Sequence, residues 1–163
     1  MQPAEERDPP AHAHYIFVAA GLSHAPYTPG REIVSTLLAL GIWLASPKTP
    51  FQKVIRAGDK AIFYVGGSKA HYFLGQATVA GPAAAVEAGD EVALERLGLV
   101  GFAKRIPLRG VHLWREALPL RPLVDRLNFV KNKRYYGLNL IKSVVRISEE
   151  DYWWIVGQSG LSE

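Results

Sequence analysis

The chain has 163 residues, 48% hydrophobic and 21% charged, which is typical of one globular domain with a substantial core. It contains no cysteine, which excludes disulfide frameworks and thiolate catalysis. The longest apolar run, residues 37–45, is too short to span a membrane, and the Pro-rich, acidic start lacks the order of a signal peptide. We therefore expect a cytoplasmic protein with a disordered leader over residues 1–13 and a single domain over residues 14–163.

The net charge of +4 is unevenly distributed along the chain. Between Lys104 and Arg146 there are eleven lysines and arginines but two acids, Glu116 and Asp125, which gives this stretch +9. The rest of the chain holds 8 basic and 13 acidic residues, or −5. A basic stretch of this kind favours a polyanionic partner, because neutralised phosphates release counterions. The alternative is a solvated basic face, or arginines paired with carboxylates elsewhere in the fold.

In chain order, an apolar, aromatic-rich run at residues 15–20 predicts the first buried strand. A helix is predicted next, with Thr28 as its N-cap, Pro29 at its first position and Gly41 at its C-cap. Trp43 comes two residues later, in a stretch interrupted by prolines. We therefore expect this tryptophan to stand in a loop and not in a regular element.

The middle of the chain predicts a hairpin followed by a helix. A short helix is expected at residues 51–56, before a Gly-Asp turn at residues 58–59. This turn leads into two strands, residues 60–65 and 72–80, which we expect to pair in antiparallel fashion. Residues 83–97 carry Ala, Val and Leu among acids, and they predict a helix with a break at the internal glycine.

The C-terminal third predicts two strands on either side of a glycine, then a short helix, a last strand and a final helix. Their expected bounds are residues 102–108, 111–117, 119–127, 143–147 and 149–156. Ser148 resembles the N-cap of a capping box for the final helix. Because hairpin connections outnumber strand–helix–strand crossovers, we expect an α+β fold: curved, mostly antiparallel strands in a small barrel, with flanking helices.

The residues that carry catalysis in enzymes are not arranged for it in this sequence. The five histidines are isolated from one another or lie in the leader, whereas a metal site needs three or four converging ligands. The loop at residues 66–69 is similar to part of a phosphate loop, but it joins two strands and opens no helix. The acids at residues 149–151 are explained by a helix N-terminus. We therefore expect no metal, no cofactor and no enzymatic activity.

Aromatic side chains are a better indication of function. Trp43 stands in the predicted loop, Tyr64 lies near a strand end, and Phe129 lies among lysines that precede two tyrosines. Interleaved cations and rings are typical of nucleic-acid grooves, where cations hold phosphates and rings stack on unpaired bases. Two alternatives stay open: Trp43 packs at the helix exit, and Phe129 anchors its loop to the barrel. The other tryptophans are expected to be structural: Trp114, Trp153 and Trp154.

Three stretches of the chain resemble the EVE family of the PUA-like superfamily, whose relatives include the YTH domains. The first is LGIWLAS, residues 40–46, and the second is the Gly-Asp turn with its hairpin, residues 56–79. The third, residues 118–152, carries LNFVKNK, then an aromatic residue followed by Gly, and the closing ISEED. The resemblance covers most of the chain, from Tyr15 to Val156.

This resemblance implies a PUA-like pseudo-barrel that binds DNA or RNA, because family members bind nucleic acid and several turn a modified base into an aromatic-lined pocket. Trp43 is then expected to be a wall of the pocket, with Tyr64 close by. Hydrogen bonds to the base edge are expected from Ser46 and from the backbone around Gly21, Leu22 and Ser23. The expected phosphate contacts are Lys69, Arg105, Lys131, Lys133 and Arg134.

The chain departs from the YTH pattern in one place. A second aromatic wall follows the return strand in YTH domains, whereas residues 81–98 contain no aromatic side chain, and Tyr27 is the alternative wall. Two other functions stay open. One is a module that binds a nucleoside or a protein partner, as an accessory to RNA modification or defence. The other is an RNA-processing enzyme of the same superfamily, which would need an acid beside Lys69.

Overall fold

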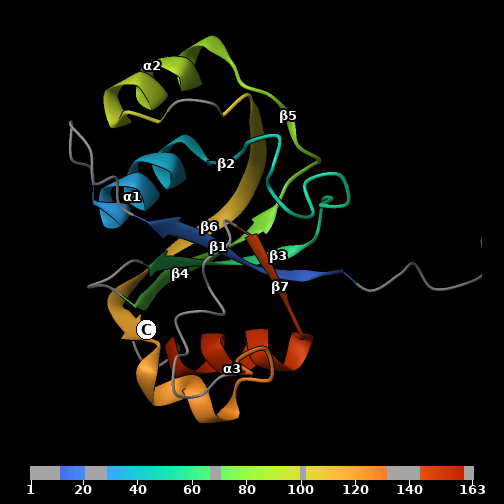
Figure 1. Cartoon of the computed structure of the whole chain (residues 1–163), viewed down its shortest axis with the longest axis vertical. Helices are drawn as coiled ribbons and strands as arrows, with labels where there is room; N and C mark the ends of the chain where they lie inside the picture. Colours follow the sequence, from blue (N-terminus) through green and yellow to red (C-terminus); the bar gives the residue numbers. More distant parts are fainter. Residues whose placement is uncertain (1–11, 21–28, 67–70, 100–101, 132–143, 160–163) are drawn as a thin grey trace, which may run out of the picture.

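The computed structural model describes residues 12–20, 29–66, 71–99, 102–131 and 144–159. Among these residues, seven strands form one curved sheet flanked by helices (Figure 1). The strands are β1 (His14–Ala20), β2 (Ile42–Ala45), β3 (Lys60–Gly66), β4 (Tyr72–Val79), β5 (Ala84–Ala85), β6 (Lys104–Pro119) and β7 (Val144–Ile147). The helices are α1 (Gly30–Leu40), α2 (Ala88–Leu97), the 3-10 helix η2 (Arg121–Arg126) and α3 (Glu149–Ser159).

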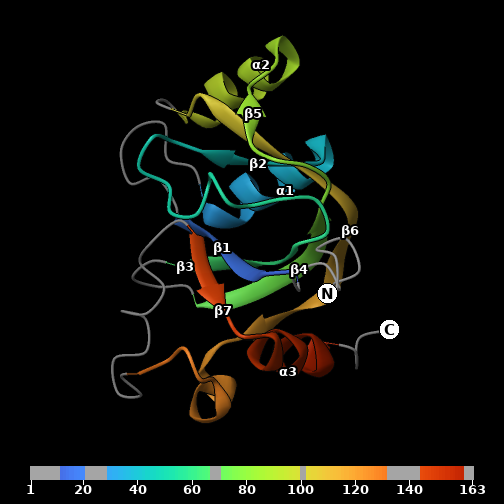
Figure 2. The same cartoon turned by 90° about the vertical axis from the view of Figure 1, so that its right-hand side faces the viewer.

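The sheet is mixed but mostly antiparallel. Its strand order is β2-β6-β4-β3-β1-β7, and β5 pairs with β6 outside this path. β1 and β3 pair in parallel over their whole length, whereas the other pairs in the described residues are antiparallel. β6 is the strand that curls the sheet, because it pairs with β2 at one end and with β4 along the rest (Figure 2). The predicted α+β fold with a curled, mostly antiparallel sheet is confirmed.

The core has two layers, one on each face of the sheet. Alternation along β3 separates them, since Phe63 faces one layer while Ile62 and Tyr64 face the other. We call the layer under α1, which contains Phe17, Trp43 and Phe63, the α1 layer. The layer under α3 and η2, which contains Tyr64, Phe73 and Tyr152, is the α3 layer. Figure 1 shows α1 and α2 on one side of the sheet and α3 on the other.

Helix α1 ends as predicted but begins differently. Gly41 adopts φ 71° in the left-handed region, and its N–H donates to the carbonyls of Leu37 and Leu38, so the predicted C-cap is confirmed. Pro29 is the N-cap and not the first helical residue, because its φ of −64° and ψ of 146° are extended. Thr28, predicted as the N-cap, lies outside the described residues.

Long-range pairing changes the elements on either side of the hairpin. The stretch with Trp43, predicted to be a loop, is strand β2, because Ile42–Ala45 pair with Lys104–Pro107 of β6. Residues 51–54 form a turn and residues 55–56 have no regular structure, so the predicted short helix is absent from this stretch. The two strands expected around Gly110 are the single strand β6, since Gly110 takes φ 60° without ending it.

Helix α2 begins later than predicted and runs through its glycine. The stretch expected to be helical from residue 83 includes the short strand β5, and the helix starts at Ala88. Glu87 and Asp90 exchange hydrogen bonds with each other's backbone as a capping box, which fixes this start. Gly89 then falls in the first turn of the helix, and it causes no break.

A buried aspartate explains the Gly-Asp turn before β3. The Asp59 carboxylate accepts the N–H of Ala13 at 2.9 Å and the N–H of Arg56 at 3.0 Å. It therefore joins the start of β1 to the turn that opens β3. Gly58 takes φ 94°, a conformation that side-chain-bearing residues rarely adopt.

Within the described ranges, no helix has the length and apolar character needed to cross a membrane.

Candidate nucleic-acid interface

Trp43 lies in the core and not in an exposed loop. It stands opposite Ile106 in the β2–β6 pair, and 4% of its surface is exposed. Its ring centroid is 5.6 Å from that of Phe17 and 5.3 Å from that of Phe63. The predicted loop position is therefore wrong, and the alternative that Trp43 packs at the helix exit is correct, because pairing with β6 turns the ring into the α1 layer. Its role as a wall of a base pocket stays a prediction.

Tyr64 lies on the opposite face of the sheet from Trp43. Its side chain is 0% exposed, and its hydroxyl is hydrogen-bonded to Nδ1 of His71 at 2.9 Å. Its ring packs against Phe73 in the α3 layer, with centroids 5.1 Å apart. The sheet separates the two rings, so Trp43 and Tyr64 do not line one pocket, contrary to the prediction.

The remaining predicted pocket residues fall into two groups. Ser46 is half-buried and shapes the turn after β2: its hydroxyl accepts the Lys48 N–H at 3.3 Å, and its N–H donates to Thr49 Oγ1 at 2.8 Å. This hydroxyl therefore stabilises the backbone of the turn through a local hydrogen bond. The other predicted residues lie outside the described residues: Gly21, Leu22, Ser23 and Tyr27.

Most of the basic stretch faces solvent. Seven of its eleven cations are both described and exposed: Lys104, Arg109, Arg115, Arg121, Arg126, Lys131 and Arg146. Both of its acids, Glu116 and Asp125, are exposed as well. Three more cations lie outside the described residues, namely Lys133, Arg134 and Lys142, as does the predicted contact Lys69. The charge excess read from the sequence is therefore a property of the described surface.

Arg105 is the exception among the predicted phosphate contacts. Its side chain is 19% exposed, its Nε lies 2.8 Å from Asp90 Oδ2, and its Nη1 lies 3.5 Å from Glu87 Oε2. The Nε–H does not point along the line to the carboxylate, so the contact is an ion pair and not a directed hydrogen bond. For Arg105 the alternative of pairing within the fold is correct, because two carboxylates at the start of α2 already neutralise it.

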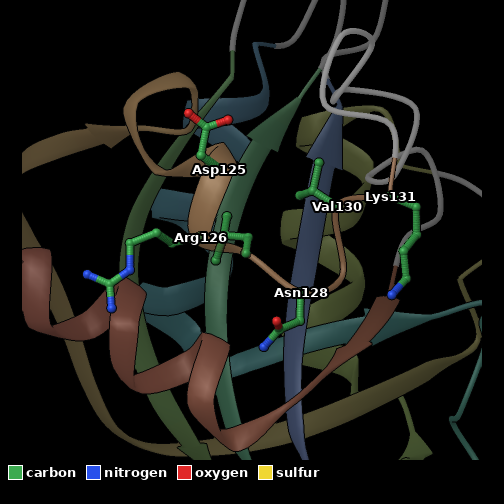
Figure 3. Close-up of a pocket in the computed structure, with 6 residues that line it drawn as sticks. Asp125, Arg126, Asn128, Val130 and Lys131 are labelled. Atoms are coloured by element: carbon green, nitrogen blue, oxygen red, sulfur yellow. The ribbon is translucent and has the colours of Figure 1, made fainter.

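A hollow of about 460 Å³ lies beside η2 and the turn that follows it. Its walls come from one continuous segment, residues 125–131, excepting Phe129. Figure 3 shows Arg126 and Lys131 on opposite sides of this hollow, with Asn128 between them and Asp125 at one end. The lining therefore combines two cations, a carboxylate and an amide.

The turn that forms the hollow is fixed to α3 by a second buried aspartate. Asp151 accepts the backbone N–H of Asn128 at 2.9 Å and that of Phe129 at 3.0 Å. The Ser148 hydroxyl accepts the Asp151 N–H at 3.0 Å, which confirms the predicted N-cap, although the carboxylate of Asp151 holds the turn. Phe129 packs against the α3 layer, so the alternative that it anchors this segment is correct.

The tryptophans of α3 differ in environment. Trp154 is half-buried, and the guanidinium carbon of Arg126 lies 3.9 Å from its ring centroid, a cation–π contact. Trp153 is 50% exposed and is not a core residue, and its structural role is limited to an edge-on contact with Tyr152, at 5.0 Å between ring centroids. The helical period of the sequence could have predicted the exposure of Trp153, because the buried positions Tyr152, Ile155 and Ser159 lie on one stripe of the helix that does not include it. Trp114 is buried as predicted, and its Nε1 donates to Gln76 at 3.0 Å.

Two titratable side chains of the α3 layer have shifted pKa values. Burial lowers the pKa of His14 from 6.5, although Glu149 and Asp59 act in the opposite direction. Burial raises the pKa of Tyr152 to about 12. Their ring centroids lie 4.9 Å apart, and both groups are uncharged at neutral pH. In the described part of the chain, no three His, Asp or Glu side chains converge as a metal site would require.

Comparison with known proteins supports the fold. No family model matches the chain, and no curated protein matches it. The human THYN1 protein in complex with 5-methylcytosine containing DNA is similar at TM-score 0.58 and 11% identity, over 90% of this chain and 97% of that one. The YTH domain of Zygosaccharomyces rouxii MRB1, in complex with N6-methyladenosine RNA, is similar at TM-score 0.58 and 13% identity. That match covers 98% of this chain and 94% of the YTH domain.

A third structure, of a domain without a named ligand, has the same architecture. The DUF55 domain of human thymocyte nuclear protein 1 matches at TM-score 0.59 and 11% identity, over 91% of this chain and 99% of that domain. At these identities the likeness concerns the fold and not the individual site residues. This chain therefore has the fold of the THYN1 and YTH-domain structures, which confirms the expected architecture.

Proposed function

We propose that this protein binds nucleic acid and catalyses no reaction on it. The observation that carries the proposal is the exposed basic stretch, in which seven described cations face solvent with two exposed acids among them. A surface of this charge attracts a phosphate backbone, and counterion release then drives association. Two proteins of this fold are in complex with nucleic acid, one with DNA and one with RNA.

We propose further that the protein reads a base turned out of its strand, and that the base carries a methyl group. Both complexes of this fold contain methylated nucleic acid, which supports this finer proposal. The α1 layer offers three adjoining rings, Phe17, Trp43 and Phe63, of which Trp43 stands on the short strand β2. Because the Trp43 ring is covered, a base reaches it only if the residues above it separate, at a cost in packing energy.

The two levels of the proposal are tested by one titration series. Labelled oligonucleotides are compared as three pairs with and without the methyl group: single-stranded DNA with 5-methylcytosine, single-stranded RNA with N6-methyladenosine, and duplex DNA with 5-methylcytosine. Backbone binding predicts that log K falls linearly with log salt, with a slope of about −0.7 per phosphate contact on a single strand. Reading of the methyl group predicts tighter binding to one modified strand than to its unmodified pair.

Matched variants separate the residues involved. Lys131→Glu reverses an exposed charge in the basic stretch, and we expect it to weaken binding and reduce the salt slope. Arg96→Glu makes the same change on α2, outside that stretch, and is the control. Trp43→Phe keeps a ring in the core, and we expect it to reduce discrimination between modified and unmodified strands while backbone binding persists. If the affinity does not change with salt concentration, the proposal that the protein binds nucleic acid is overturned. If the affinities are equal within every pair, the proposal that it reads a methylated base is overturned.

The hollow beside η2 favours a second candidate function, the binding of a free nucleoside. Its volume of about 460 Å³ falls within the range of small-ligand sites, roughly 300–1,000 Å³. Its charges of both signs also suit a small polar ligand better than a polyanion. In that case nucleosides bind as tightly as oligomers, affinity hardly changes with salt, and Asn128→Ala weakens binding more than Lys104→Ala does.

A further inference from the structure

Phe51 is held in a conformation that phenylalanine rarely adopts. Its φ is 63°, in the left-handed region, and it is the one residue other than glycine with positive φ in the described part of the chain. For a residue with a Cβ this region costs about 1–2 kcal/mol. Backbone strain of this kind persists only where the surroundings enforce it, and it is concentrated at functional positions. Phe51 is 39% exposed, and it lies in a turn within the connection between β2 and β3, residues 46–59.

The turn around Phe51 is fixed by hydrogen bonds on both sides. The Phe51 carbonyl accepts the N–H of Val54 at 3.0 Å and that of Ile55 at 3.1 Å. The Gln52 side-chain amide donates to the Ser46 carbonyl at 2.7 Å and to the Thr49 carbonyl at 3.1 Å. The Phe51 ring also packs against Tyr15, with centroids 5.8 Å apart, and 39% of the residue faces solvent. The backbone of the turn is therefore fixed, and the ring lies partly at the surface with Tyr15 on one side.

The surroundings of this ring are basic. The segment from Ser46 to Gly58 contains three cations and no acid, and all three cations are exposed: Lys48, Lys53 and Arg56. Arg56 lies 3.9 Å from the buried carboxylate of Asp59, so part of its charge is neutralised. Exposed Arg146 of β7 stands directly opposite Tyr15 in the sheet. Directly opposed residues share one face, so Arg146 adds a cation on the side of Tyr15 that Phe51 covers.

We propose that this turn is a nucleic-acid contact of its own, at which an unpaired base stacks on Phe51 while Lys48, Lys53 and Arg146 hold the adjoining phosphates. This proposal rests on the proposed function, because it names a contact that such a protein makes with a single strand. We call the group formed by Lys48, Phe51, Lys53 and Val54 the Phe51 patch. Its chemistry is that of single-strand binding sites, where a ring stacks on a base and nearby cations follow the backbone.

A single-stranded polyanion fits the Phe51 patch better than a membrane does. The exposed apolar side chains of the patch are one phenylalanine and Val54, which is a small area for insertion into a bilayer. A ring that already packs against Tyr15 also suits stacking, because less side-chain entropy is lost when the base arrives than for a ring without a neighbour. The patch lies in the connection between β2 and β3, on the α1 side of the sheet, whereas the hollow is formed by the end of η2 and the turn after it (Figures 1 and 3).

The test compares variants at residue 51 with an exposed ring elsewhere. Phe51→Gly removes the ring and accepts φ 63° without strain, so we expect the turn and the melting temperature to be kept. Binding to an unmodified single strand should weaken roughly 5- to 150-fold, the equivalent of one lost stack, and Phe51→Trp should restore it. Trp153→Ala is the control, because that ring is exposed on α3 beside Glu149 and Glu150, and should leave binding unchanged.

Charge variants supply an independent measurement. Lys53→Gln should reduce the salt slope by about 0.7, the contribution of one phosphate contact on a single strand, whereas Arg96→Gln should not change it. If the wild type binds and Phe51→Gly binds equally well, the Phe51 contact is overturned while the proposed function stands. If the wild type binds no strand, both fall. If anionic vesicles bind the wild type but not Phe51→Gly, the patch is a membrane contact and the inference is overturned. Should Phe51→Gly fail to fold, Phe51→Asn replaces it, since asparagine tolerates this region of φ.

Discussion

The two layers of the core are held together by different physical forces. The α1 layer is an apolar cluster in which Phe17 and Trp43 stack, Phe63 packs against both at an angle, and the sheet curls around them. The α3 layer is also apolar inside, but its helix is attached through polar contacts: Asp151 holds the turn after η2, and Arg126 covers Trp154. The α1 layer should therefore respond to changes in volume. The α3 layer should respond to changes in charge and pH.

The largest expected effect is in the α1 layer. Trp43→Ala removes a buried indole and leaves a cavity among rings that cannot close it, and we expect the free energy of unfolding to fall by about 3–5 kcal/mol. Trp43→Phe should cost much less, because it keeps a ring in the same layer. Urea denaturation of both variants measures the difference. Equal stability of wild type and Trp43→Ala would mean that the indole is not part of the core.

The second effect concerns the attachment of α3. Asp151→Ala leaves the N–H groups of Asn128 and Phe129 without their acceptor, and we expect a loss of about 2–3 kcal/mol in unfolding free energy. Glu150→Ala is the control, since its carboxylate is exposed and accepts from the Asn128 side chain at 2.9 Å. That variant should change stability by less than about 0.5 kcal/mol. Comparable losses in the two variants would contradict the special role of the buried carboxylate.

The third effect is a pH dependence that comes from the α3 layer. Burial lowers the folded-state pKa of His14 below 6.5, so the fold favours the neutral ring. Its contribution to stability is therefore complete above pH 6.5, and it is lost as the pH falls from 6.5 through the lower folded pKa. One proton limits the slope to about 1.4 kcal/mol per pH unit.

The measurement for His14 is the unfolding free energy of wild type and His14→Gln between pH 5 and 8. Carboxylates near the ring, Glu149 and Asp59, contribute to both proteins, so the difference between the two curves isolates the histidine. We expect the wild type to lose its advantage over the variant on acidification. Parallel curves across this range would show that the ring is not held neutral by the fold.

The smallest effect tests the contact between η2 and α3. Arg126→Ala removes a guanidinium that lies 3.9 Å from the ring centroid of Trp154, and we expect a loss of about 0.5–1 kcal/mol. Arg126→Lys should recover part of it, since an ammonium group also interacts with the ring face. Chemical denaturation followed by tryptophan fluorescence measures both variants. If Arg126→Ala lowers the free energy of unfolding as much as Asp151→Ala does, the cation–π contact stabilises this attachment as strongly as the buried carboxylate does.

Local sequence signals predicted most elements of the fold. The left-handed cap at Gly41, the hairpin of β3 and β4 and the N-cap at Ser148 all depend on residues close together in the chain, and the structure confirms them. The environment of Trp43 was predicted wrongly, because strand β2 exists only by pairing with β6, about sixty residues away. Prolines and a glycine around it indicate a loop when only the neighbouring residues are considered.

The candidate site was less predictable than the fold for the same reason. The sequence places Tyr64 and Trp43 in similar contexts, but the face that each ring occupies depends on strand pairing and alternation. Phe51 shows the converse case, because its exposure and strained φ follow from a turn tied by Gln52, which no periodic pattern indicates. The charge excess, in contrast, was predictable, since long charged side chains remain at the surface in almost any fold.

Strand β6 has a consequence for how the molecule unfolds. It is 16 residues long, and it pairs with β2 and β5 near its start and with β4 over the remainder. The two parts of the sheet, β2 with β5 and β4 with the strands beyond it, therefore both pair with β6, and each part loses interstrand partners when β6 detaches. Domains joined by a linker can unfold one after the other. Because β6 is shared by both parts of this sheet, we expect them to unfold together in one cooperative transition.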